Sequence, residues 1–261
     1  MLIRVKFSKL GSLKFIGHLD VMRYFQKVLS RSGLPVKYTQ GFHPHQIMSF
    51  ASPLGVGLTS DGEYMDFELN QELPLEEIRQ ALVDSLTDGF IISMVTILTP
   101  RVMNVKKVSS MALVDSADYL LYLKNEEPTE TLIAAFEDAV SDLMSRKELV
   151  INKKTKTSEK EIDIKPYIYD YAFSFDEFLC GRSLDTKYKE ALFCSLPVCK
   201  GPQLLLHLSA GSNMNLKPEV ILEELLSSVD CGLSVDDFGV HRLEMYHCDE
   251  KGDYLPLWDI K

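Results

Sequence analysis

The sequence lacks any long apolar run. No stretch of its 261 residues approaches the roughly 20 consecutive apolar residues that a transmembrane helix requires. The most apolar segment, residues 90–98, has the length of a buried strand. The first seven residues alternate apolar and basic side chains and do not have the layout of a signal peptide. We therefore expect a cytoplasmic protein that makes no membrane contact.

Closely spaced cysteines are also missing. The five cysteines are an odd number and include no Cys-x-x-Cys pair, which argues against a disulfide framework, a zinc ribbon and an iron–sulfur cluster. The sequence has no Walker loop, no Gly-x-Ser-x-Gly elbow and no kinase signature. These absences lead us to expect no cofactor held by this chain, apart from the divalent metal considered below.

Acidic charge dominates the chain but not its first 60 residues. The formal net charge of the whole sequence is −10. Residues 1–60 contain eight Lys or Arg and one acid, a net of +7, which leaves −17 for residues 61–261. This segregation favours an anionic ligand at the basic part of the chain.

Hydrophobic periodicity predicts two similar halves. Residues 1–100 follow the order strand, helix, strand, strand, helix, strand, which is the ferredoxin-like pattern. After residues 99–116, which we expect to be a linker, the same order restarts and contains an insertion. We therefore predict an α+β fold of two ferredoxin-like (βαββαβ) domains, 1–100 and 117–250, that form a pseudo-duplicated structure.

The elements of this pattern are bounded by common start and stop signals. Asp20 is a candidate cap for the first helix, Pro35 prevents its continuation, and Thr129 is expected to cap a later helix. Alternation from residue 64 to residue 69 suggests that Asp66 and Glu68 lie on the solvated side of a strand. The expected strands are 2–7, 36–38, 64–69, 90–98, 118–123, 149–151, 162–164, 204–208 and 240–246, and the expected helices are 19–31, 75–86, 129–143 and 218–226.

The segment Gly41-Phe42-His43-Pro44-His45 is the most informative stretch of the chain. Two imidazoles beside a proline can bind a metal, act as general bases or donate hydrogen bonds to phosphate. A turn here would bring them near the start of the first helix. The predicted ligand-binding residues are His18, Asp20, Gly41, Phe42, His43 and His45. A divalent metal held by His18, His43 and His45 is one form of this site. The alternative is that one imidazole caps backbone groups and the other is solvated.

Basic side chains predict contacts with phosphate groups. Aromatic residues accompany them, and this combination on a sheet is suited to nucleic acid, whose bases stack on exposed rings. The expected phosphate-binding residues are Arg4, Lys6, Arg23, Arg31 and Lys37, with Lys153, Lys154 and Lys156 at a predicted hairpin tip. The alternatives are a solvated helix face, aromatics that belong to the core, and a solvated hairpin tip.

Several segments together resemble one protein family. They are Phe7-Ser8-Lys9, Phe15 to Asp20, Arg31 to Pro35, Gln40 to His45, Ser49 to Gly57, Lys153 to Ile168 and His241 to Tyr246. Over nearly its whole length the chain resembles the bacterial radical-SAM-linked family. This is a domain of unknown function, found alone or fused behind a cobalamin-type radical S-adenosylmethionine domain. The resemblance implies a radical S-adenosylmethionine enzyme as partner, because stand-alone members tend to be encoded beside one and near RNA-processing genes. Since this chain has no Cys-x-x-x-Cys-x-x-Cys, any radical chemistry would belong to that partner.

These observations predict an accessory substrate-binding protein that holds RNA for a radical enzyme that modifies it. Two alternatives remain open at this point. The first is a metal-dependent enzyme built on His18, His43 and His45, and the second is a pure protein–protein adaptor. The prediction requires that the imidazoles and the cationic side chains surround one common hollow.

Overall fold

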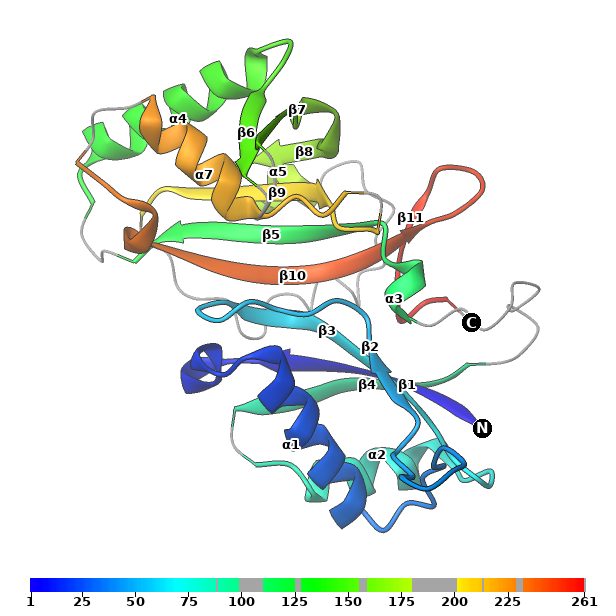
Figure 1. The fold of residues 1–261 in the computed structure, drawn as a ribbon. Helices are drawn as coiled ribbons and strands as arrows, with labels where there is room; N and C mark the ends of the chain where they lie inside the picture. Colours follow the sequence, from blue (N-terminus) through cyan, green and yellow to red (C-terminus); the bar gives the residue numbers. More distant parts are fainter. Residues whose placement is uncertain are drawn as a thin grey trace. The chain divides into compact units, whose positions relative to one another are not determined.

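The computed structural model describes residues 1–87, 89–98, 110–124, 128–154, 159–179, 201–212, 214–228 and 232–260. The fold is α+β, with a nine-stranded main sheet and a separate two-stranded sheet (Figure 1). The chain divides into two compact units. Unit 1 comprises Met1–Ser116 and Arg242–Lys261, and unit 2 comprises Ala117–His241. Residues 242–250, which the sequence suggested for a second domain, therefore group with the first unit.

Unit 1 is built on three long antiparallel strands. β1 pairs with β3 on one side and with β4 on the other. The short strand β2 pairs with β3, and β11 pairs with β10. The elements are β1 (Leu2–Lys9), η1 (Gly11–Phe15), α1 (His18–Arg31), β2 (Met48–Phe50), β3 (Thr59–Glu68), α2 (Leu75–Asp84), β4 (Phe90–Leu98), α3 (Ser110–Leu113), part of β10 (Phe238–Cys248) and β11 (Tyr254–Pro256).

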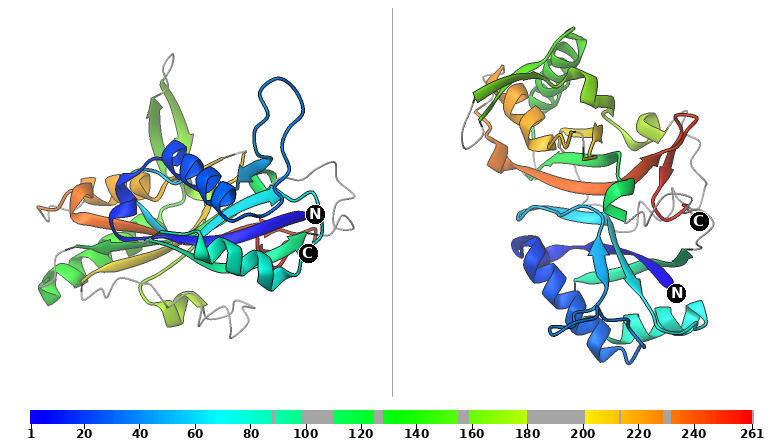
Figure 2. Two further views of the ribbon diagram at one scale, coloured as in Figure 1. Left: turned by 90° about the horizontal axis from the view of Figure 1, so that it is seen from below. Right: turned by 45° about the vertical axis from the view of Figure 1, so that its right-hand side comes forward.

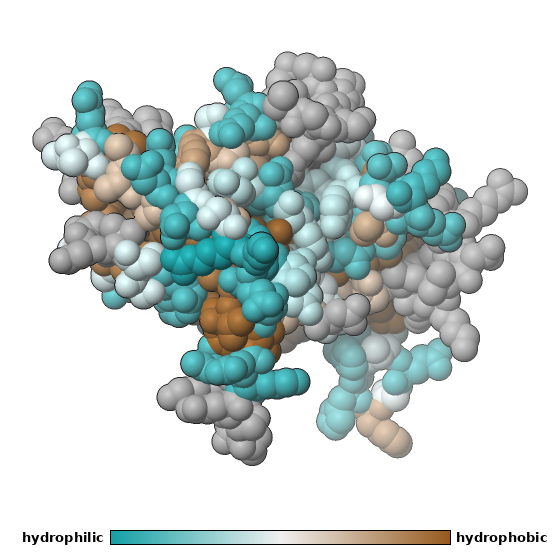
Figure 3. Space-filling view, turned by 90° about the horizontal axis from the view of Figure 1, so that it is seen from above, coloured by the Kyte–Doolittle hydropathy of each residue, from teal (hydrophilic) through white to brown (hydrophobic). Residues whose placement is uncertain are grey.

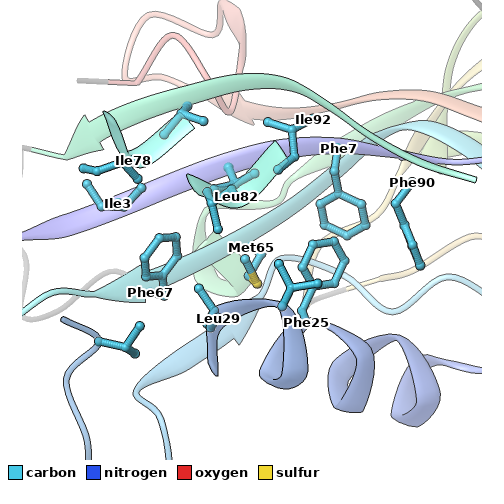
Figure 4. Close-up of a cluster of buried hydrophobic side chains, with 14 of the residues drawn as sticks. Ile3, Phe7, Phe25, Leu29, Met65, Phe67, Ile78, Leu82, Phe90 and Ile92 are labelled. Carbon is cyan, nitrogen blue, oxygen red and sulfur yellow. The ribbon is translucent and has the colours of Figure 1, made fainter. Parts of the chain in front are cut away.

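The core of unit 1 lies between this sheet and its two helices. Alternate residues of β1 and β3 point to one face, where they meet the apolar stripes of α1 and α2. Figure 4 shows Phe7, Phe25 and Phe90 close together in this cluster; the ring centroids of Phe7 and Phe25 are 4.5 Å apart. Because the apolar stripe of α1 is buried in this core, the charged residues of α1 lie on the opposite, solvent-facing side of the helix.

Strand β10 joins unit 1 through a close backbone approach. A Cβ atom on Gly62 would lie 2.6 Å from the Cα of Glu244 and 2.7 Å from the carbonyl oxygen of Leu243. Only glycine leaves room for two backbones at this separation. The contact explains why residues 242–248 belong with β3, and the sequence carries no periodic signal for it.

Unit 2 contains a set of paired strands, two longer helices and a separate two-stranded hairpin. Its strand order is β10-β5-β9-β8, and β6 pairs with β7. Figure 1 shows α4 and α7 on the same side of its strands. The elements are β5 (Ser116–Leu123), α4 (Glu130–Ser145), β6 (Val150–Lys154), β7 (Glu159–Asp163), η3 (Lys165–Tyr167), β8 (Ile168–Ala172), α5 (Phe175–Leu179), β9 (Gln203–Ser209), α7 (Pro218–Ser227), η4 (Val235–Asp237) and the first residues of β10.

Of the two expected helix caps, Thr129 is confirmed and Asp20 is wrong. The Thr129 side chain accepts a hydrogen bond from the backbone N–H of Leu132 at 3.2 Å, so it caps α4 as expected. The expectation for Asp20 is wrong, because Gly17 is the N-cap of α1 and Asp20 lies in the first turn. The predicted strand at 36–38 is reduced to two isolated bridges, Val36 to Leu69 and Tyr38 to Gln46.

On the side of the molecule drawn in Figure 3, the described surface is mostly polar. Figure 3 shows hydrophilic residues over most of the described part of that side, with apolar residues in separate patches. Within the described ranges, no helix is both long and apolar enough to cross a membrane.

Candidate functional site

Helix α1 presents a row of cationic side chains to solvent. Arg23, Lys27 and Arg31 are spaced four residues apart and are all exposed. Residues at this spacing lie on one face of a helix. The face exists because the buried stripe of α1 is occupied by Val21, Phe25, Val28 and Leu29.

The chain between α1 and β2 folds back as a loop with a paired stem. The Thr39 backbone N–H donates to the His45 carbonyl oxygen at 2.8 Å, and that of Ile47 donates to the Lys37 carbonyl oxygen at 2.9 Å. The turn includes Gly41, whose φ of 124° lies in the region that favours glycine. In Figure 2, left, this loop is drawn in blue and projects from unit 1.

The stem of the loop and the cationic face of α1 enclose an open pocket of about 520 Å³. From α1 come the three cationic residues with Gln26 and Ser30, and from the loop come Tyr38, His45 and Gln46. This is a concave site that combines positive charge, a half-exposed aromatic ring and several hydrogen-bonding groups. Such a combination suits a ligand that carries phosphate and a flat ring.

Gln46 fixes the loop against the helix. Its side chain is 7% exposed. The Nε2 atom donates to the Gln26 carbonyl oxygen at 3.2 Å, to Ser30 Oγ at 3.1 Å and to the Tyr38 hydroxyl at 3.4 Å. The Oε1 atom has no hydrogen-bond partner within the part of the chain that the structure describes. A buried acceptor without a donor is unusual, and here it lies in a wall of the pocket.

The three cationic side chains of the pocket form no strong ion pair among the described residues, so they can bind an anion. Arg23 Nη1 lies 3.4 Å from an oxygen of Asp20, and both side chains are largely exposed. Arg31 Nη2 donates to the Ser85 carbonyl oxygen at 2.8 Å, which is a neutral acceptor. Lys27 has no ion pair among the described residues. Exposed pairs such as Arg23–Asp20 are weak, so an incoming anion can compete for Arg23.

The imidazoles do not form the predicted metal site. His45 lines the pocket, with Nδ1 3.1 Å from Thr39 Oγ1 and 3.4 Å from the His43 carbonyl oxygen. His18 begins α1 and packs edge-on against Phe50, with ring centroids 5.4 Å apart. No group of three His, Cys, Asp or Glu among the described residues could hold a metal ion. The geometry of the described residues therefore does not support a metal bound by His18, His43 and His45.

The other predicted ligand residues are distributed around the loop. Gly41, Phe42 and His43 lie at its exposed tip, outside the pocket wall. Asp20 approaches the site only through its pair with Arg23.

Arg4 and Lys6 are not available to a phosphate, which corrects the prediction for both. Arg4 forms two hydrogen bonds with the carboxylate of Asp66, at 2.9 and 3.0 Å, and Lys6 Nζ lies 2.6 Å from a carboxylate oxygen of Glu244. All four side chains are buried. The solvated strand face expected around Asp66 is instead a buried ionic layer. It includes Arg242, which is paired with Glu63.

Of the remaining predicted lysines, the structure describes the side chain of Lys37 alone, and Lys37 does not line the pocket. Lys37 is half-exposed and pairs with Glu68 at 2.7 Å. Lys153 and Lys154 belong to β6, and their side chains fall outside what the structure describes. Lys156 lies outside the described residues altogether.

The buried ionic layer shifts two pKa values. Burial, together with the neighbouring Glu244 carboxylate that accepts a hydrogen bond from the Tyr64 hydroxyl at 2.5 Å, raises the pKa of Tyr64 well above its usual value. Burial also lowers the pKa of Lys9, against a smaller opposing effect from Glu63. Both shifts follow from the removal of charge from water.

Three pocket residues, Gln26, Ser30 and Gln46, could not be named from the sequence, because their place depends on the loop folding back onto α1. Lys27 shares the spacing of Arg23 and Arg31, so periodicity finds it with them. Tyr38 is one of the aromatic residues expected to accompany the basic side chains.

Comparisons with known proteins give one family and a distant structural likeness. No curated protein matches the chain. Among solved structures, a chain of the "Crystal Structure of a Cbf5-Nop10-Gar1 Complex" is similar at a TM-score of 0.45 and 10% sequence identity. The alignment covers 95% of this chain and 50% of that one, so the present chain spans about half the length of its match.

A family model matches most of the chain. Residues 2–218 match the family described as "Uncharacterized protein conserved in bacteria (DUF2344)". This range includes α1, the loop and the whole pocket. The chain therefore belongs to the DUF2344 family of uncharacterized proteins conserved in bacteria.

Proposed function

We propose that this protein is an accessory RNA-binding protein that holds RNA in the pocket beside α1 for a modifying enzyme. The observation that carries the proposal is the row of Arg23, Lys27 and Arg31 along one wall of a pocket whose other wall holds Tyr38 and Gln46. Arginine and lysine bind phosphate oxygens, and an exposed aromatic ring can stack on a base. The RNA, a polyanion, would contact the basic first 60 residues of an otherwise acidic chain.

The proposal is tested by removing the pocket cations together. We expect the variant R23A/K27A/R31A to lose most of its affinity for a short single-stranded RNA, measured by fluorescence anisotropy at fixed low salt. The variant loses only two exposed contacts, Arg31 with Ser85 and Arg23 with Asp20, so its thermal stability should change little from that of the wild type.

A matched control separates this site from general charge. Arg79→Ala removes an exposed cation from α2, Arg146→Ala removes one that follows α4, and Lys251→Ala removes one between β10 and β11. The triple variant of these residues removes the same number of charges and should bind RNA nearly as the wild type does. Equal losses in the two variants would mean that RNA responds only to total charge, and the pocket would lose its role.

The partner is proposed to be a radical S-adenosylmethionine enzyme. The family resemblance suggests this partner, and an exposed apolar patch of Phe15, Leu19 and Val56 supports a protein contact. A 2.7 Å hydrogen bond from the Gly57 backbone N–H to the Lys14 carbonyl oxygen holds the two parts of this patch together.

Co-purification tests the partner. We expect a tagged radical S-adenosylmethionine enzyme from the same organism to retain the wild-type protein and to lose L19S/V56S. Val83→Ser, an exposed apolar position on α2, serves as the control. Retention of all three proteins to the same extent would remove the patch from the interface.

We also infer that both units are ferredoxin-like and that the chain is a pseudo-duplication. The strand order β4-β1-β3 with β2 beside β3 supports this in unit 1, and the order β10-β5-β9-β8 supports it in unit 2. Each unit then has the order βαββαβ, with its helices on one face. Amide-to-amide contacts measured by NMR should place β5 between β10 and β9; any other neighbour would contradict the inference.

A further inference from the structure

The loop beside the pocket ends in a fully exposed phenylalanine. Phe42 is 102% exposed. Burial of an aromatic ring is one of the larger favourable contributions to folding, and it is absent here. Single exposed apolar residues are common on protein surfaces, so the exposure alone decides nothing. The support beneath the ring is more informative.

The stem below Phe42 holds the tip of the loop in place. Thr39 and His45 are joined by a backbone hydrogen bond of 2.8 Å and by a second bond of 3.1 Å from the His45 backbone N–H to Thr39 Oγ1. One residue further down, Gln46 is buried against α1. The ring is therefore carried by an anchored hairpin, which lowers the entropy that a ligand must remove on binding.

The ring also lies near the phosphate-binding wall. Phe42 is three residues from His45, whose side chain lines the pocket. Three residues of chain span at most about 11 Å, so the Cα atom of Phe42 lies within that distance of the Cα atom of His45. Tyr38, 47% exposed, lies in the pocket wall itself. Two accessible rings thus accompany the three cations of α1.

We propose that the site is specific for single-stranded RNA, with one unpaired base stacked on Phe42 while neighbouring phosphates contact the cations of α1. This rests on the proposed function and narrows its substrate class. Stacking on a protein ring requires a base that is free of its helical neighbours, which a duplex does not offer. A protein partner could also cover Phe42, but three adjacent cations favour a polyanion.

The test compares single-stranded and duplex RNA of one sequence with three variants of Phe42. We expect F42A to weaken single-strand binding by about five- to 150-fold, the range found for removal of a stacked aromatic ring. F42L, which keeps apolar bulk without a π-face, should lose affinity similarly, and F42W should retain it. All three variants should unfold at the wild-type temperature because the side chain is exposed.

Three results would overturn the inference while the proposed function survives. They are wild-type affinity in F42A, full affinity in F42L, and duplex binding as tight as single-strand binding. A loss of enzyme co-purification in F42A, with RNA affinity unchanged, would assign the ring to a protein partner and would also overturn it. If the wild type binds no RNA at all, the proposed function fails first, which is a different outcome.

Discussion

Removal of one partner of the buried Arg4–Asp66 pair should be one of the most destabilising single changes in unit 1. The two side chains are 1% and 4% exposed and share two hydrogen bonds. Asp66 also accepts a hydrogen bond from the Ser110 backbone N–H at 3.0 Å. Asp66→Ala would leave the guanidinium buried without its carboxylate and the Ser110 amide without its acceptor.

The expected loss can be worked out from these contacts. Removal of one partner of a buried ion pair costs about 3–5 kcal/mol, because a buried charge is left uncompensated. With a urea dependence of about 3 kcal/mol per molar for a unit of this size, the midpoint of unfolding should fall by about 1 to 1.7 M.

The chain contains a built-in probe for this measurement. Its only tryptophan, Trp258, belongs to unit 1 and follows Leu257, whose carbonyl oxygen accepts a hydrogen bond from Arg4 at 2.8 Å. Tryptophan fluorescence in urea therefore reports on unit 1. The double variant R4M/D66L is the control, since it leaves no buried charge unpaired and loses only the hydrogen bonds to Ser110 and Leu257, so its midpoint should fall less than that of D66A. A midpoint within about 0.2 M of the wild type for D66A would refute this reasoning.

Three further predictions concern the same fold. Tyr64 keeps its proton in the folded state above pH 10, where the unfolded state releases it, so stability should fall as the pH rises beyond 10. In urea unfolding at several pH values, Tyr64→Phe should lose less stability above pH 10 than the wild type does. An equal loss in the two proteins would mean that other groups cause it. Thr129→Ala should destabilise α4 by about 1 kcal/mol in thermal unfolding, while Thr129→Ser should not, because it keeps the capping oxygen. Gly62→Ala should lower the urea midpoint that Trp258 fluorescence reports, because the new Cβ atom would meet the Glu244 backbone. An unchanged midpoint would mean that β10 can shift away from β3 with no loss of stability.

Local patterns were sufficient for most elements of the fold. The helix of residues 18–31 and the strand of residues 90–98 follow from periodicity, and Thr129 follows from capping preference. The return of residues 242–261 to unit 1 could not be predicted, since Gly62 reveals a need for close approach only once its neighbour is known.

The candidate site was predictable only in part, for a related reason. Charge segregation and helical spacing pointed to Arg23 and Arg31, which line the pocket. The same basic composition misled for Arg4, because alternation along a strand does not tell a solvated face from a buried ionic one. The acid that neutralises Arg4 lies 62 residues further along the chain, a distance at which sequence patterns carry no pairing signal.

The salt dependence of RNA binding tests the central claim most directly. Each phosphate contact with single-stranded RNA contributes about 0.7 to the slope of log affinity against log salt concentration. Loss of the three contacts in R23A/K27A/R31A should therefore reduce the magnitude of the slope by about 2 relative to the wild type. An equal slope for the two proteins would contradict the assignment of phosphate binding to helix α1.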